Sequence, residues 1–395
     1  MPHNNKGLSR RNVLKGVGAS VATAAGSGLA AAKPNDKVEV NVGFSSKRGR
    51  DAAVDKASDV VREFGSLDIV TAQMPAKAAK GLENNPNVRY VEENGTMEAL
   101  AQSLPWGVDR VDAEVAHANG ETGAGADIAI IDTGIDDDHP DLQANLGTGK
   151  SFVSCGNGGY FGCAFSGNSN SCNTSWSDDN DHGTHCAGIA NGVNNSEGVV
   201  GVSTEATLHA VKVLDCAGSG SMSDIAAGIE YVANQGWDVA SMSLGGSSSS
   251  ALKDAVQYAS SKGVFLVAAA GNDGSCTDCV GYPAAYSEVM AVSSTNSSDG
   301  LSSFSSQGPE IEIAAPGTDI YSTVPSGYST LSGTSMACPH VAGAAGQLMA
   351  NGNSASDTRS QLKSSAEDIG LASNESGAGL LDAAAALGLD SSDST

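Results

Sequence analysis

Hydrophobic and polar positions alternate along the chain in a way that predicts a layered fold. Past residue 100, four apolar runs predict buried strands, at Ile128–Ile131, Thr207–Val213, Val239–Leu244 and Val264–Ala270. Segments of helical spacing between them predict helices over Thr184–Gly192, Met222–Gln235 and Ser250–Lys262. This alternation favours an α/β fold with a doubly wound, mostly parallel sheet flanked by helices. Ligands bind such sheets beyond the carboxyl ends of the strands, where Asp132 and Asn272 lie.

The first hundred residues show a different pattern, which predicts a small α+β module over residues 34–100. Apolar and polar positions alternate as in a strand over Val38–Phe44, and further strands are predicted over Leu67–Val70 and Val88–Glu93. Helical spacing predicts helices over Ala52–Phe64 and Pro75–Glu83.

The charge balance changes near the same point. Residues 1–100 carry 14 basic and 11 acidic side chains, whereas residues 101–395 carry 7 basic and 34 acidic ones. Disorder does not explain this acidity, because apolar runs such as Val264–Val267 predict buried strands. An acidic, lysine-poor surface excludes nucleic acid as a natural partner. It favours a protein built for high salt, where counterions screen the repulsion between carboxylates.

The first 33 residues predict an export signal. Ser9–Lys15 contains a twin-arginine pair, and a stretch rich in Ala, Gly and Val follows to about Ala32. This stretch is too short and too weakly apolar for a membrane span. A basic, unstructured tail is the alternative. No later run is long and apolar enough to cross a bilayer, so we expect a mature protein that is secreted and has no membrane contact.

The eight cysteines fit an oxidising compartment, although the sequence does not determine their pairing. Cys186 and Cys338 adjoin the motifs described below, and we expect both to be buried free thiols. Cys276 and Cys279 form a CxxC that closes on itself or pairs elsewhere. A metal site is the weaker interpretation, because no second pair of ligands is evident nearby. The pairing stays open for Cys155, Cys163, Cys172, Cys216, Cys276 and Cys279.

Three short motifs carry candidate nucleophilic chemistry. One apolar run ends at Asp132, the motif Asp181–His185 places His182 beside a glycine, and Ser335 stands at a glycine-rich bend. A serine hydroxyl is a poor nucleophile until a base takes its proton. His182 would be that base, and Asp132 would hold its tautomer. Asp, then His, then Ser is one of the three chain orders in which such a triad recurs.

The sequence around Ser335 gives more specific evidence for a nucleophilic serine. We expect Gly333 to allow a tight turn and Ser335 to lie at the start of a helix over Met336–Met349, beside backbone amides and the positive helix end. The run GTSMACPHVAG, from Gly333 to Gly343, resembles the serine motif of the subtilisin-like serine proteases, the subtilases. The pattern is most similar to the secreted haloarchaeal members called halolysins. In the family pattern HGTHxAG the first histidine is catalytic, so the resemblance implies structural roles for His185 and His139.

The resemblance also implies residues that contact the substrate. Ala268–Asp273 resembles the family's oxyanion motif, so the Asn272 side chain and the Ser335 amide would donate to the tetrahedral intermediate. A peptide would bind as an extra strand, with Ala269 and Gly271 on the floor of the first pocket. Small residues there imply a preference for large uncharged side chains. Two edges would flank the peptide, and they comprise Gly218, Ser219, Gly220, Ser243, Leu244, Gly245 and Gly246.

A structural calcium site is implied in the same way, because the segment Ala101–Gly107 and the loop Val193–Val199 resemble the mature N-terminus and the calcium loop of subtilisins. Calcium prefers hard oxygen ligands from carboxylates, amides and carbonyls. An ordinary Asn/Gly turn is the alternative. The implied ligands are the side chains of Gln102, Asp141 and Asn195 and the carbonyls of Val193, Glu197 and Val199.

Residues 34–100 resemble the inhibitor-like propeptide of subtilases in length, position and order of elements. The resemblance implies a self-processing preproenzyme whose propeptide acts as an intramolecular chaperone and inhibitor and is removed near Leu100–Gln102. The catalytic domain would span residues 101–388, followed by a polar tail over 389–395. An ordinary N-terminal domain is the alternative. We expect a monomer that acts on proteins and peptides.

Three other functions compete with a secreted endopeptidase. An inactive, binding-only relative conflicts with the complete set of Asp132, His182, Asn272 and Ser335. An α/β-hydrolase esterase would need G-x-S-x-G and the order Ser, Asp, His, and the chain has neither. A tripeptidyl exopeptidase is poorly excluded by sequence alone.

Overall fold

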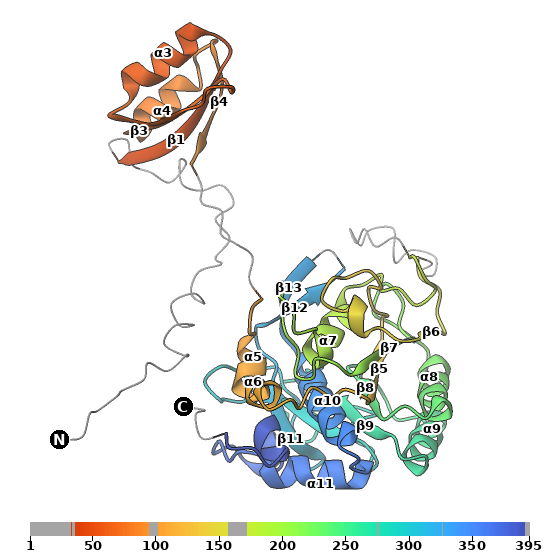
Figure 1. The fold of residues 1–395 in the computed structure, drawn as a ribbon. Helices are drawn as coiled ribbons and strands as arrows, with labels where there is room; N and C mark the ends of the chain where they lie inside the picture. The colour runs from red at the N-terminus through yellow and green to blue at the C-terminus, as the bar shows by residue number, and fades with distance from the viewer. Residues whose placement is uncertain are drawn as a thin grey trace, which may run out of the picture. The chain divides into compact units, whose positions relative to one another are not determined.

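The structure is a computed structural model that describes residues 33, 36–94, 102–156, 172–274, 276–325 and 327–391. The chain divides into two compact units, residues 1–99 and 100–395 (Figure 1). The twin-arginine segment, Cys163 and the end of the polar tail lie outside the described residues, as do Leu100 and Ala101 at the expected maturation site. None of the helices in the described ranges has the length and apolar content that a membrane span needs.

The N-terminal unit is a four-stranded antiparallel sheet with two helices. Its strands occur in the order β2-β3-β1-β4. The alternating valines of β1 pack with Ala53 and Ala79 from the helices, so both helices contribute to one core. The elements are β1 (Lys37–Phe44), α3 (Lys47–Lys56), β2 (Asp59–Glu63), β3 (Ile69–Pro75), α4 (Ala76–Leu82) and β4 (Val88–Glu93).

The helix predicted over Ala52–Phe64 is wrong in its second half. The helix α3 ends at Lys56, Ala57 takes an extended conformation, and β2 follows, with Val60 opposite Ala72 of β3. The β-branched pair Val60–Val61 favours a strand once a neighbouring strand is available. The predicted helix is therefore correct only for residues 52–56, and the rest of the segment is not helical.

The C-terminal unit is built on a seven-stranded parallel sheet in the order β11-β10-β9-β8-β5-β7-β6. The four predicted strands are confirmed as β5 (Asp127–Asp132), β7 (Thr207–Lys212), β8 (Val239–Met242) and β9 (Phe265–Ala269). The sequence did not predict the remaining three strands. They are β6 (Lys150–Ser151), β10 (Met290–Thr295) and β11 (Ile311–Pro316).

Helices cover both faces of this sheet, as the doubly wound prediction requires (Figure 1). Ile128 and Ile130 of β5 pack into the core that contains α7 (His182–Asn191) and α10 (Thr334–Ala350). Ala129 and Ile131 alternate to the other core, with α8 (Met222–Gln235) and α9 (Ser250–Ser261). The remaining elements are α5 (Trp106–Arg110), α6 (Ala113–Ala118), η1 (Gln143–Asn145), β12 (Ile320–Val324), β13 (Gly327–Leu331), α11 (Ala355–Ser365), α12 (Ser373–Ser376) and α13 (Ala383–Ala386).

Small residues let α10 pass through the interior of the unit. Fourteen of its residues are buried, and a Cβ at Gly343 would lie only 2.6 Å from the Ala190 carbonyl oxygen of α7. The two helices therefore approach closely, which brings the first residues of α10 and α7 to the carboxyl edge of the sheet. This packing places Ser335 and His182 on the same side as Asp132.

Candidate active site

Asp132 is the last residue of β5 and is completely buried. Its Oδ1 atom accepts a hydrogen bond from the Thr133 amide at 2.7 Å and one from His182 Nδ1 at 2.8 Å. A buried carboxylate is stable only when it is hydrogen-bonded or paired. The position of His182 thus follows from the need to satisfy this carboxylate.

His182 opens α7, and its side chain is 28% exposed. Burial alone would lower the pKa of His182, but the charge and hydrogen bond of Asp132, with a smaller contribution from Asp178, raise the pKa above its ordinary value. Because Nδ1 donates to Asp132, Nε2 is left to act as a proton acceptor. The imidazole therefore has the tautomer and the environment of a general base.

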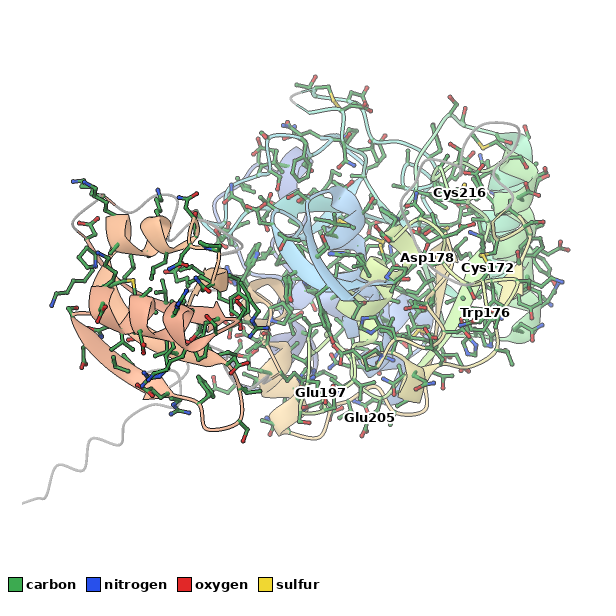
Figure 2. The ribbon with its side chains drawn as sticks, turned by 90° about the horizontal axis from the view of Figure 1, so that it is seen from above. Cys172, Trp176, Asp178, Glu197, Glu205 and Cys216 are labelled. Carbon is green, nitrogen blue, oxygen red and sulfur yellow. A yellow bond between two sulfur atoms is a disulfide. The ribbon has the colours of Figure 1, made fainter. Side chains whose placement is uncertain are left out.

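Asp178, which is labelled in Figure 2, lies in the segment that leads into α7, and the sequence did not identify it as a site residue. Its carboxylate accepts hydrogen bonds from Thr133 Oγ1 at 2.8 Å and from the Thr184 amide at 2.9 Å. Between these contacts the backbone takes a left-handed conformation at Asp181, with φ of 98°, which is strained for a non-glycine residue. The buried carboxylate of Asp178 therefore fixes the entry of His182 into the site.

Ser335 lies in the first turn of α10, as predicted, although the helix begins at Thr334 rather than Met336. Its backbone carbonyl accepts hydrogen bonds from Ser243 Oγ at 2.7 Å and from Cys186 Sγ at 3.4 Å. Its hydroxyl donates to the Ser243 carbonyl at 3.3 Å, and the hydrogen bonds of the described residues include none from Ser335 to His182. Contacts between nucleophile and base are often looser before substrate binds.

The other two histidines of these motifs are held by backbone carbonyls. His185 is buried, and its Nε2 lies 3.1 Å from the carbonyl oxygens of both Ile320 and Ser329. Burial lowers the pKa of His185 to about 4, so its ring is neutral. His139 Nε2 lies 3.0 Å from the Gly327 carbonyl. Both environments support structural roles for these rings.

Asn272 lies beside the first turn of α10. Its Oδ1 atom accepts hydrogen bonds from the Thr334 amide at 2.9 Å and from Thr334 Oγ1 at 3.1 Å. This arrangement turns the Nδ2 group away from Thr334. A Cβ at Gly333 would lie 3.6 Å from both Asn272 Nδ2 and the Ser335 amide nitrogen, so the two donors border one space. Such a pair suits a developing oxyanion.

Gly333 does not serve the tight turn that the sequence suggested. Its φ of 164° is extended backbone that any residue adopts. A Cβ at position 333 would make only ordinary van der Waals contacts, at 3.6 Å from Asn272 Nδ2 and from the Ser335 amide nitrogen, but it would occupy the space that these two donors border.

The predicted substrate edges meet in a cavity of about 410 Å³ beside His182. The cavity is lined by both predicted edges, Gly218–Gly220 and Ser243–Gly246, and by an apolar group that the sequence analysis missed. Ala269 and Gly271 are not among the residues that line it; Ala269 is buried in β9. The apolar group comprises Leu214, Met222, Ile225, Leu252 and Tyr282.

Comparison with known proteins identifies the family. The profile of the Subtilase family matches residues 123–379. Subtilisin amylosacchariticus from Bacillus subtilis subsp. amylosacchariticus is 42% identical over 334 residues, which cover 82% of this chain and 83% of the relative. Subtilisin E from Bacillus subtilis (strain 168) matches with the same identity and coverage. An alkaline protease from Alkalihalobacillus alcalophilus is 42% identical over 332 residues, 83% of this chain and 81% of the relative.

The chain belongs to the subtilase family. It is therefore a serine-type endopeptidase of the subtilisin kind that acts on protein substrates, and its N-terminal unit is the propeptide-like region of such proteins.

The predicted calcium ligands of this subtilase come together at one place. Gln102 Nε2 donates to the carbonyls of Val193 at 2.6 Å and Val199 at 3.1 Å, and Asn195 Nδ2 donates to Asp141 Oδ1 at 3.2 Å. Two carbonyls and a buried carboxylate thus converge with two side-chain amides. A half-turn of the Gln102 amide would present its oxygen to this group in place of nitrogen, and the Asn195 oxygen already accepts the Glu197 amide at 2.6 Å. Oxygens of carboxylate, carbonyl and amide are the ligands that calcium prefers.

Glu197 contributes to this loop through its backbone. Its amide donates to Asn195 Oδ1 at 2.6 Å, and its carboxylate is exposed (Figure 2). Asp141 Oδ2 accepts the Val199 amide at 2.7 Å, so the carboxylate is bound from two sides. The contacts of Gln102, Asp141, Asn195 and the Val193 and Val199 carbonyls fit the predicted calcium ligands, and Glu197 joins the same loop through its amide.

The cysteines fall into two groups. Disulfides join Cys155 to Cys172 and Cys276 to Cys279, so the CxxC closes on itself. Cys216 is also disulfide-bonded. Cys186 and Cys338 are buried free thiols, as predicted, and burial raises the pKa of Cys338 to about 11. Neither buried thiol is therefore a reactive thiolate.

Replacement of Thr334 by Val should lower kcat while KM changes little. The Thr334 hydroxyl donates to Asn272 Oδ1 and so orients the amide. The Asn272 Nδ2 group is the expected oxyanion donor, which would act mainly on the transition state. In a subtilisin, loss of the corresponding asparagine reduces kcat by about 10²–10³-fold, so we expect loss of its support to reduce kcat by about tenfold. The control is Thr330→Val, at an exposed position of β13. Equal kcat values for the two variants, measured with a peptide anilide, would contradict this role.

Proposed function

We propose that this subtilase is a secreted, salt-adapted endopeptidase of the halolysin type that hydrolyses extracellular proteins through Asp132, His182 and Ser335. The main support for this triad is the 2.8 Å contact between the buried Asp132 carboxylate and His182 Nδ1. The contact lies at the edge of the sheet where α10 begins with Thr334 and Ser335. Family membership gives the reaction class, and this contact supports the assignment of Asp132 and His182.

Each residue of the proposed triad has one task in acyl transfer. Ser335 Oγ attacks the scissile carbonyl while His182 Nε2 takes the hydroxyl proton. Asp132 stabilises the imidazolium that forms. The Asn272 side chain and the Ser335 amide donate to the oxyanion. His182 then gives its proton to the leaving amine, and water hydrolyses the acyl-enzyme by the same steps.

The shape of the cavity supports broad specificity for uncharged side chains. A peptide that adds as a strand between Gly218–Gly220 and Ser243–Gly246 would place alternate side chains towards the apolar lining of Leu214, Met222 and Ile225. Glycines along both edges let the peptide backbone approach closely. Ala269 and Gly271 are proposed to floor the first pocket.

The chain is proposed to be made as a preproenzyme. Residues 1–33 would be a twin-arginine export signal and residues 34–100 an inhibitor-like propeptide that assists folding and blocks the site until it is cut. The catalytic domain would then comprise residues 101–388, with a short tail over 389–395. The small antiparallel fold of the N-terminal unit and the change of charge near residue 100 support this division.

Ser335→Ala should abolish peptide hydrolysis and leave the precursor uncut, because maturation near Leu100–Gln102 is proposed to be self-processing. The control is Ser332→Ala, an exposed serine in the same loop, which should mature and hydrolyse normally. Mass spectrometry of the secreted protein reports the N-terminus. A Ser335→Ala protein with the normal mature N-terminus would sink the self-processing claim, and one with normal activity would sink the triad.

A calcium ion is proposed to lie among Gln102, Asp141, Asn195 and the carbonyls of Val193, Glu197 and Val199. When bound, it would supply charge neutralisation for the buried Asp141 and a link between three chain segments. The hydrogen bonds that already join Gln102 and Asp141 to the Val193–Val199 loop support this position.

Calcium should therefore slow thermal inactivation and autolysis. A ligand that binds only the native state stabilises by about 2.7 kcal/mol at 100 times its Kd. At fixed ionic strength, chelation should shorten the half-life of the wild type, and Asp141→Asn should remove most of the difference. Glu197→Gln is the matched control, since its side chain is exposed and only its carbonyl is a proposed ligand. Half-lives that coincide with calcium and with chelator would exclude the site.

The acidic surface of the C-terminal unit supports salt adaptation. Exposed carboxylates such as Glu197 and Glu205 lie on it, whereas four of its seven basic side chains are taken up in ion pairs (Figure 2). Those four are Arg110, Lys212, Arg359 and Lys363. Most of the negative charge therefore has no cation beside it in the described ranges.

Thermal stability should rise steeply with salt, because the Debye length falls from about 10 Å at 0.1 M to about 3 Å at 1 M and the repulsion between carboxylates is screened. The measurement is the unfolding midpoint of Ser335→Ala, which cannot digest itself, from 0.1 to 3 M KCl at saturating calcium. A midpoint that does not change with salt would rule out the adaptation.

A further inference from the structure

Lys212 is the last residue of β7 and is completely buried. Its ammonium group has three acceptors: the Thr133 carbonyl at 2.5 Å, Asp179 Oδ1 at 2.6 Å and the Leu214 carbonyl at 3.0 Å. An ammonium has three N–H donors, so every donor is used. A lysine in a strand would ordinarily be expected at the surface, and this one is fully engaged inside the protein.

The three acceptors belong to three segments that build the active site. Thr133 directly follows Asp132, and Asp179 precedes His182 by three residues. Leu214 lines the substrate cavity and leads into the Gly218–Gly220 edge. The Lys212 ammonium thus joins the acid of the triad, the approach to its base and one wall of the cavity.

Asp179 is the ionic partner of Lys212 and is 7% exposed. Its second carboxylate oxygen accepts the Gly156 amide at 2.7 Å. Both charges of the pair are therefore enclosed and each is satisfied by the other. Such a pair gives little net stability compared with apolar residues of similar size, but replacement of one partner leaves the other as an uncompensated buried charge. We therefore expect the pair to matter mainly for the positions of the segments that it joins.

We propose that Lys212 and Asp179 are positioning residues that hold the His182 segment at a fixed place relative to Asp132 and the substrate edge. Their neutral pairing also keeps the buried ammonium from opposing the imidazolium of His182. This role rests on the proposed triad, in which neither residue touches the substrate.

Several other ionisable groups lie near His182, and the variants used below to test the proposal leave all of them in place. Asp132 on β5 and Asp178 in the preceding loop both favour the imidazolium. His185, on the same helix, is neutral, and burial raises the pKa of the Cys186 thiol well above its usual range. Neither Lys212 nor Asp179 is among the groups that shift the pKa of His182, as expected for a pair without net charge, so removal of one partner adds a new charge to the site.

The first test is Asp179→Asn, which keeps the shape and an acceptor but leaves the ammonium uncompensated. In a plot of kcat/KM against pH, the fall on the acid side reports the pKa of His182 in the free enzyme. This acid limb should move to lower pH by about half a unit, because the uncompensated ammonium opposes the imidazolium. Looser positioning should also lower kcat by about tenfold with little change in KM. The matched control is Asp254→Asn, an exposed carboxylate on α9 with the same change of charge. Its limb and kcat should match the wild type.

Lys212→Met should move the acid limb the opposite way, because it leaves Asp179 unpaired. The double variant should return the limb to the wild-type position while kcat stays low. If Lys212→Met is not secreted in folded form, the comparison of Asp179→Asn with Asp254→Asn is sufficient for the test.

Two results would overturn the positioning role. One is an unchanged kcat in Asp179→Asn. The other is a reduced kcat with an acid limb that does not move, which indicates a general loss of structure. A failure of the triad itself is separate and appears as activity in Ser335→Ala.

Discussion

The active site depends on one constraint, the need to satisfy the charge of Asp132 in the interior. The carboxylate ends β5 with no exposure, and a single oxygen accepts both the Thr133 amide and His182 Nδ1. Without the imidazole, a buried charge would lose its main side-chain partner, at a cost of several kcal/mol. The same contact fixes the tautomer of His182 and raises its pKa. Stability and chemistry therefore both depend on the contacts of Oδ1, since Asp132 Oδ2 is buried and has no hydrogen-bond partner among the described residues.

The parallel sheet explains why residues so far apart in sequence meet at this contact. β5 and β9 end at the same edge, which brings Asp132 close to the segment of Asn272, and the small residues of α10 let the helix that carries Ser335 pack in the interior. A set of polar contacts then fixes the loops: Asp178 holds the approach to α7, Thr334 orients Asn272, and Lys212 joins three segments. Secondary structure brings the groups to one edge, and these buried polar contacts set their orientation.

The sequence predicted the elements that carry strong local signals. Four apolar strands, the order of Asp132, His182 and Ser335, and the buried thiols of Cys186 and Cys338 all could be read from pattern and motif. It did not predict the contacts of Asp178 or Asp179, because an acidic residue in a loop looks like a solvated one until its partners are known. The helix predicted over Ala52–Phe64 failed for a related reason, since pairing of Val60 with β3 overrides helical spacing. Long-range polar and strand contacts leave little trace in local pattern.

The central claim is that burial of Asp132 against His182 makes Ser335 a nucleophile. The most direct measurement is the rate at which a sulfonyl fluoride forms a covalent adduct, with the labelled residue mapped by mass spectrometry. The account predicts a single adduct on Ser335 in the wild type and a rate that is slower by up to about 10⁴-fold in Asp132→Asn, in which the amide stabilises the wrong tautomer. An adduct on another serine, or equal rates in the two proteins, would contradict it.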